Sequence, residues 1–169
     1  DTATGSIINW YTAGNTNTIG SNGATATEVI WSDISTSANN AALRSFAVPA
    51  DDNSGWKGEG TTDSPYRLHF DGSNDNVLNY GVNAPDTVSI WFKADSVTDG
   101  NIWSMNSNNR VYLSSGNLYT EYNNALNDAT GLDADTWYHF VLSNDGDDTK
   151  YYLNELGTVF QSHYDSVVQ

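Results

Sequence analysis

The segment Asp71-Gly-Ser-Asn-Asp-Asn76 places several oxygen-bearing side chains close together in the chain. Hard cations such as Ca²⁺ are bound in proteins by carboxylate, amide and carbonyl oxygens. The same residue types are also the ones that tight turns prefer. The segment is therefore a candidate calcium site, with Asp71, Asn74 and Asp75 as the proposed ligands, and a simple turn is the alternative.

Aromatic side chains beside amides form a second candidate site, because sugars are held by aromatic faces together with hydrogen bonds from Asn and Asp. The alternative is that alternate aromatic residues pack a core. Trp56 stands in a glycine-containing loop and is the ring that we expect to be most exposed. The candidate ligand-binding residues are Trp56, Trp91, Trp103, Tyr112, Asn108 and Asn109.

Residue spacing argues against catalysis. Retaining glycoside hydrolysis needs two carboxyl groups about 5 Å apart, and no Glu-x-Asp-x-Glu spacing occurs. The glutamates are isolated from one another: Glu28, Glu59, Glu121 and Glu155. The chain has no cysteine and no Gly-x-Ser-x-Gly, and its 3 histidines show no zinc spacing. We therefore expect no enzymatic activity.

The charge of the chain excludes further classes of partner. The 169 residues include 6 basic and 21 acidic side chains, for a net charge of −15. Such a field repels phosphate backbones and anionic membrane surfaces, and no run of about 18 apolar residues could insert into a bilayer. We expect neither nucleic-acid binding nor membrane insertion. The charge itself indicates either solubility in a salty medium or binding of divalent cations.

Short strand-like runs recur from Tyr66 onward, separated by turn signals such as Asp99-Gly100, Ser115-Gly116 and Asp145-Gly146. They cover residues 66–70, 76–80, 87–94, 101–105, 110–114, 117–122, 136–143, 149–154 and 157–160. Alternation over 87–94 sets Val88, Ile90 and Phe92 on one face, whereas 136–143 is apolar on both faces and is expected to be buried on both. This pattern predicts an all-β, antiparallel β-sandwich or jelly roll. We expect one domain over residues 1–169.

The N-terminal third is less regular. Residues 1–30 are expected to add an N-terminal strand, Ile7 to Tyr11, and a loop with a turn at Asn22-Gly23. One helical turn is expected around Ala41, Ala42 and Leu43. Asp51 to Ser64 is expected to be a long loop, of the kind that is often functional.

Four segments together resemble the laminin-G-like, concanavalin A-like lectin/glucanase superfamily. They are Trp31 to Leu43, Tyr66-Arg-Leu-His-Phe-Asp-Gly-Ser-Asn-Asp-Asn-Val77, Thr87-Val-Ser-Ile-Trp-Phe-Lys-Ala94, and the hairpin from Thr136 to Asn154. They stand in the order of the family. The resemblance implies a concanavalin A-like jelly roll, with calcium, where present, held at its rim. The loop Asn106-Ser-Asn-Asn109 matches a calcium-bearing loop of related pentraxin-like domains, but carries amides where a carboxylate is expected.

The chain departs from the family after Asn154. Further strands follow there in the family and return to the N-terminal strand, whereas only Glu155 to Gln169 follow here. The closing strands are expected to be missing, to come from another chain, or to be replaced by the first 30 residues. An open edge invites strand addition, so edge-strand pairing into a homo-oligomer or with neighbours in a particle is an expected mode of assembly.

Together these features predict a non-catalytic extracellular recognition or adhesion module that binds glycans or surface proteins, with calcium as a candidate cofactor. The alternative is a structural protein that decorates a virus capsid or tail, or builds a surface filament, through its β-sandwich. A glycoside hydrolase is a second alternative. The expected location is extracellular, or on the surface of a virion or cell.

Overall fold

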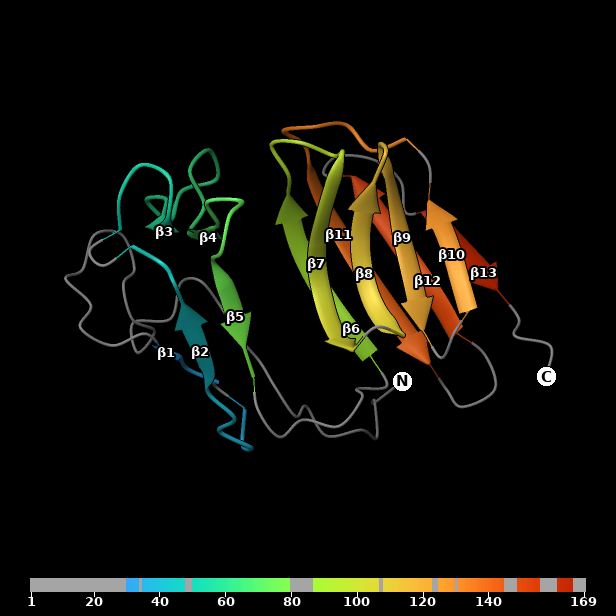
Figure 1. Ribbon diagram of the computed structural model, residues 1–169, viewed down its shortest axis with the longest axis horizontal. Helices are drawn as coiled ribbons and strands as arrows, with labels where there is room; N and C mark the ends of the chain where they lie inside the picture. The colour runs from blue at the N-terminus through green and yellow to red at the C-terminus, as the bar shows by residue number, and fades with distance from the viewer. Residues whose placement is uncertain are drawn as a thin grey trace. The chain divides into compact units, whose positions relative to one another are not determined.

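The computed structural model describes residues 30–33, 35–47, 50–79, 87–106, 108–122, 125–129, 131–144, 149–155 and 161–165 (Figure 1). The regular secondary structure in these ranges consists of β-strands alone, and all strand pairs are antiparallel. The prediction of an all-β, antiparallel protein is therefore confirmed. The predicted strands 7–11 and 157–160 and the turns at Asn22-Gly23 and Asp145-Gly146 lie outside the described residues.

The chain divides into two compact units, an N-terminal unit of residues 1–82 and a C-terminal unit of residues 83–169. The prediction of a single domain stays a prediction, and each unit is described by itself below. No helix long and apolar enough to cross a membrane occurs in the part of the chain that the structure describes.

The N-terminal unit holds a three-stranded sheet and a two-stranded one. The first has the order β1-β2-β5, and the second pairs β3 with β4. The strands are β1 (Ile30–Trp31), β2 (Ala41–Arg44), β3 (Gly55–Lys57), β4 (Arg67–His69) and β5 (Asn76–Leu78). The expected helical turn around Ala41 is wrong, because β2 pairs with both neighbours and alternates, with Ala41 and Leu43 buried and Arg44 exposed.

The C-terminal unit consists of two four-stranded sheets, ordered β10-β9-β8-β7 and β13-β12-β11-β6. Figure 1 shows the first sheet lying over the second. The strands are β6 (Thr87–Lys93), β7 (Asp99–Asn106), β8 (Asn109–Ser114), β9 (Asn117–Tyr122), β10 (Ala125–Ala129), β11 (Trp137–Asn144), β12 (Thr149–Glu155) and β13 (Gln161–Asp165). The predicted turn at Asp99-Gly100 is wrong, because both residues pair with β8 within β7.

One hydrophobic core lies between the inner faces of these two sheets. Its largest fully buried side chains include Val111 of β8, Leu118 of β9, and Phe140 and Leu142 of β11. Side chains alternate between the faces of a strand, and accordingly β8, β9 and β11 each contribute every second residue to the core. Burying one such side chain stabilises the fold by about 1.5–3 kcal/mol. The unit is thus a sandwich-like pair of sheets.

The β8–β9 hairpin shows how the predicted turn chemistry fixes the register. Ser115 and Gly116 have φ values of 51° and 85°, and Ser114 pairs with Asn117 across the turn. Positive φ at both central residues is what a tight two-residue hairpin turn requires. The two turn amides donate hydrogen bonds to the carbonyl oxygens of Thr98 (2.8 Å) and Val97 (2.9 Å). The tip of this hairpin is thereby tied to the segment between β6 and β7.

Candidate functional site

The predicted calcium ligand Asp71 closes a turn. Its Oδ1 accepts hydrogen bonds from the backbone N–H groups of Ser73 (2.8 Å), Asn74 (3.2 Å) and Asp75 (3.4 Å). These bonds, that from Ser73 above all, hold the pKa of the Asp71 carboxyl below its ordinary value of 3.8. The arrangement is the local side-chain-to-backbone bonding that Asp commonly provides in turns.

Asp75 links this turn to Ser54, the residue directly before β3. Its Oδ2 accepts a hydrogen bond from Ser54 Oγ at 2.6 Å and another from the Asp71 N–H at 3.0 Å. Ser54 Oγ in turn accepts the N–H of Ala47 at 2.9 Å. Asp75 Oδ1 is buried and has no hydrogen-bond partner among the described residues. Asn74, the third predicted ligand, has an exposed side chain.

The geometry therefore accounts for Asp71 and Asp75 as turn-forming residues. Across the described ranges, no group of three or more His, Cys, Asp or Glu residues could hold a metal ion. The Oδ1 atom of Asp71 already accepts hydrogen bonds from three backbone N–H groups. Calcium at this turn stays a prediction.

Trp56 was expected to be the most exposed ring, and this expectation is wrong. The residue is only 5% exposed and belongs to the core of the N-terminal unit with Leu43 and Phe46. The Trp31 ring meets it edge-on at a centroid distance of 5.2 Å. The glycine-containing loop around it suggested a surface position, but the pairing of β3 with β4 turns the ring inward.

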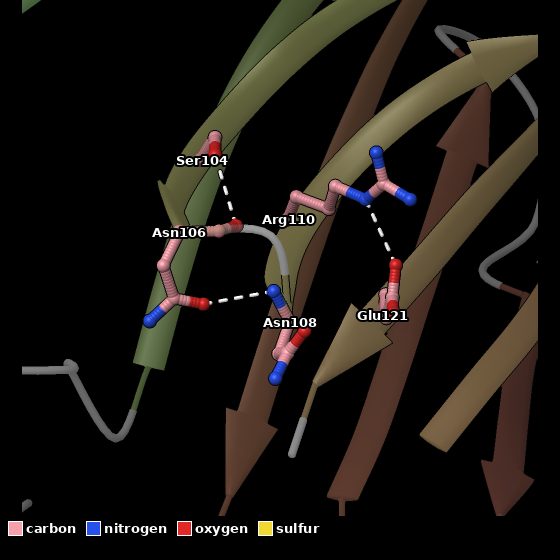
Figure 2. A network of polar contacts seen from close by, with 5 residues as sticks. All are labelled: Ser104, Asn106, Asn108, Arg110 and Glu121. Atoms are coloured by element: carbon pink, nitrogen blue, oxygen red, sulfur yellow. Dashed lines mark hydrogen bonds and ion pairs between the residues drawn. The ribbon is translucent and has the colours of Figure 1, made fainter. Parts of the chain in front are cut away.

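The β7–β8 turn carries the two predicted amides. Asn106 Oδ1 accepts the N–H of Asn108 at 2.8 Å, and Ser104 Oγ donates to the Asn106 carbonyl at 3.2 Å (Figure 2). Asn108 is exposed, and Asn109 is half-buried at the start of β8. Trp103, on β7, packs against the core of the C-terminal unit and so contributes to the fold.

Tyr112 lies on the outer face of the β8 sheet in a cluster of its own. The Tyr119 ring stacks beside it at a centroid distance of 5.3 Å, and Arg110 Cζ lies 4.3 Å from the centroid of Tyr112. Arg110 Nε also contacts Glu121 Oε2 at 2.8 Å, as Figure 2 shows. The rings of Tyr112 and Tyr119 and the charge of Arg110 are therefore largely engaged in contacts with one another and with Glu121.

Trp91 is the large hydrophobic side chain with the greatest exposure among the described residues, at 52%. It stands on β6 opposite His139 of β11, and the two rings stack at 4.6 Å with an interplanar angle of 8°. Ser89 Oγ and His139 Nε2 lie 2.9 Å apart and share a hydrogen bond. The role of His139 was missed in the sequence, where a histidine inside a strand has packing as its default role.

Trp91 belongs to a wider surface, which we name the β6–β11–β12 face. The pleat and the register bring the same side of three neighbouring strands together. Its described side chains are Thr87, Ser89, Trp91 and Lys93 of β6, Trp137, His139, Val141 and Ser143 of β11, and Lys150 and Tyr152 of β12. None of these is an aspartate or glutamate, although the chain has 21 acidic residues. The side of β11 that belongs to this surface is half-buried, so the expectation that β11 is buried on both faces is wrong.

The candidate ligand-binding residues thus do not form one site. Trp91 lies on the β6–β11–β12 face, Tyr112 on the outer face of the other sheet, and Trp103 against the core between them. Trp56 belongs to the N-terminal unit. No family model, no curated protein and no solved structure matches the chain. The β6–β11–β12 face is therefore the candidate binding surface.

Proposed function

We propose that this protein is a non-catalytic recognition module with a concanavalin A-like, laminin-G-like sandwich, and that it binds a glycan on the β6–β11–β12 face. The observation that carries the proposal is the exposed indole ring of Trp91. A tryptophan side chain offers a large apolar surface with a polar N–H. Such a ring, left half in water at the middle of a strand, fits a surface that is covered when a ligand binds.

The surroundings of Trp91 support a prearranged binding surface. Its ring stacks in parallel on His139, whose imidazole is anchored by Ser89. All three side chains stand on paired strands within the sheet. A ring held in this way loses little side-chain freedom when a ligand covers it, so more of the contact energy remains as affinity.

The proposal includes an extracellular or particle-surface location and the absence of catalysis. The described glutamates support the second point, because Glu121 is paired with Arg110 and Glu59 lies in an exposed loop of the N-terminal unit. Calcium assistance remains part of the proposal and is tested by repeating each binding measurement with calcium and with a chelator.

The test is a glycan array followed by calorimetry on the wild type and on Trp91→Ala. We expect a loss of affinity of about 5- to 150-fold, by analogy with base stacking on one aromatic ring, which is worth about 1–3 kcal/mol, while thermal unfolding shows that the fold is retained. Met105→Ala is the matched control, because Met105 is also exposed but stands on β7 of the other sheet. A glycan that binds Trp91→Ala as tightly as the wild type would refute the site, and a protein ligand in place of a glycan would change the ligand class.

A structural role is the second candidate, favoured by the pairing of β6. Among the described strands β6 pairs with β11 alone, so one side of this strand carries no ladder partner in its sheet. An unpaired edge is a template for strand addition from a neighbouring chain. Light scattering separates the two roles. A calcium-independent multimer would favour a capsid, tail or filament component, and a monomer would favour the recognition module.

A further inference from the structure

Strand β6 is the least protected of the four edge strands described in the C-terminal unit. The two sheets of this unit end in β10, β7, β13 and β6. Edge strands are usually guarded against pairing with other chains by charged side chains or by bulges. β7 contains Asp99 and two register shifts against β8, β10 contains Asp128, and β13 contains Asp165. β6 has an unbroken register with β11, and its one charged residue, Lys93, stands at its last position.

The core side of β6 is also partly open. Val88, Ile90 and Phe92 of this strand pack into the core of the unit. Ile90 and Phe92 are nevertheless only half-buried, whereas Tyr138 and Phe140 of the neighbouring β11 are 4% and 0% exposed. A further strand on the free side of β6 would cover apolar surface of both half-buried side chains, and removing such surface from water favours association.

The residue sizes along β6 suit pairing with a second copy of the same strand. In an antiparallel pair centred on Ile90, each residue lies opposite the one that is equally far from Ile90 in the other direction. The opposed pairs, each of a smaller and a larger residue, are Val88–Phe92, Ser89–Trp91 and Thr87–Lys93. No two charges face each other, because the two copies of Lys93 stand at opposite ends of the pair, roughly 20 Å apart by the rise of an extended strand.

We propose that two copies of this protein pair through β6 about a two-fold axis at Ile90, so that their β13-β12-β11-β6 sheets join into one continuous sheet. Both copies use the same edge, and the assembly therefore closes at two chains. A filament or particle, in contrast, requires a second contact on each chain.

Pairing does not require glycan binding, so it goes beyond the proposed function. It is compatible with that function, because the residue opposite Trp91 in the pair is the small Ser89 of the second copy. The exposed indole therefore keeps room for a ligand, and the pair presents two Trp91 rings on one side of the joined sheet.

Light scattering on the full chain over a range of concentrations tests the pairing. We expect twice the mass of the chain, without calcium and with a chelator. The net charge of −15 makes two copies repel each other, and salt screens this repulsion, so the pair should tighten as the salt concentration rises. A single chain at every concentration and salt overturns the inference, and so does growth beyond two chains.

Two substitutions at one exposed position test the register. Thr87 is exposed and lies opposite Lys93 of the second copy in the proposed pair. Thr87→Lys should raise the dissociation constant of the pair by about two- to tenfold, and Thr87→Glu should lower it by a similar factor. Overall repulsion alone predicts the reverse order, because lysine reduces the net negative charge and glutamate increases it. Asn101→Lys makes the same charge change at an exposed position of β7 and should not weaken the pair.

Single cysteines give an independent test of the geometry. The chain has no cysteine, so one introduced thiol can form a disulfide only between two chains. Ile90→Cys places two thiols at the axis, where Cα atoms of opposed residues are about 4.5–5.5 Å apart, a separation that suits a disulfide. Thr87→Cys places them roughly 20 Å apart. We expect oxidation to link the first variant into covalent pairs and to leave the second largely unlinked, with thermal unfolding showing that both are folded.

The outcomes separate the pairing from the proposed function. Paired chains that show neither the opposite effects at Thr87 nor the preferred link at Ile90 overturn the inference, because their contact then lies elsewhere. Glycan binding by a single chain supports the proposed function and overturns the pairing. Pairing through β6 without binding of any glycan supports the inference and refutes the proposed function.

Discussion

Thr120→Val is expected to stabilise the C-terminal unit. Thr120 is 2% exposed, stands on β9 opposite Val111, and its Oγ1 is buried with no hydrogen-bond partner among the described residues. A buried polar group without a partner costs about 1–3 kcal/mol. Valine keeps the branched shape that suits a strand and replaces the hydroxyl by a methyl group. The gain should therefore be about 1–3 kcal/mol in the free energy of unfolding.

Urea unfolding followed by tryptophan fluorescence measures this gain, and thermal unfolding should show a rise of about 2–4 °C for each kcal/mol. Two controls bracket the result. Thr120→Ala loses the methyl group as well and should be no more stable than the wild type. Thr87→Val, at an exposed position of β6, should change stability by less than about 0.5 kcal/mol. A Thr120→Val protein less stable than the wild type would refute the reasoning, because it would show that the hydroxyl has a partner in solution.

Two further changes probe the loops of the N-terminal unit. Gly58→Ala should lower the free energy of unfolding by more than about 1 kcal/mol. Gly58 has φ +95°, and a Cβ at this position would collide with the backbone of Pro65. Gly72→Ala is the control and should lower the free energy of unfolding by less in the same urea titration, because Gly72 has φ +72° but open space around it. Asp71→Asn should remove a stabilisation that depends on pH, because the pKa of Asp71 in the folded protein lies below 3.8, chiefly through the hydrogen bond from the Ser73 N–H. The wild type should therefore be more stable than the variant at neutral pH. This advantage should disappear as the pH falls through the pKa of Asp71 in the folded protein. A pH-independent difference between the two proteins would contradict that assignment.

The positions of β6, β7, β8, β9, β11 and β12 could be predicted because their determinants are local, whereas β10 and β13 were not predicted. The alternation that placed Val88, Ile90 and Phe92 on one face of β6 is confirmed, with these side chains turned to the core. The Ser115-Gly116 turn is confirmed as well, because a tight hairpin needs residues that accept positive φ. Both predictions depend on residues that are close together in the chain, so the alternation of apolar residues and the residue types of the turn are enough to make them.

Trp56 and β2 could not be predicted because their environments are assembled from distant segments. The ring of Trp56 is buried by Trp31 and by Phe46. The sequence of the loop around Trp56 does not indicate either contact. The Ala-rich run at Ala41 favours a helix by intrinsic propensity. The run forms strand β2 instead because it pairs with β5, which lies more than thirty residues away in the chain. Tertiary contacts overrode the local preference in both cases.

The β6–β11–β12 face was only partly visible in the sequence, for a related reason. The alternation of β6 sets Ser89, Trp91 and Lys93 on one side, but their joint meaning depends on the register with β11 and β12. That register places the His139 ring against the indole of Trp91. A tryptophan that is 52% exposed is a departure from an acidic, polar surface. The proposed ligand, which stacks on an aromatic ring, would account for this departure, whereas solubility alone does not.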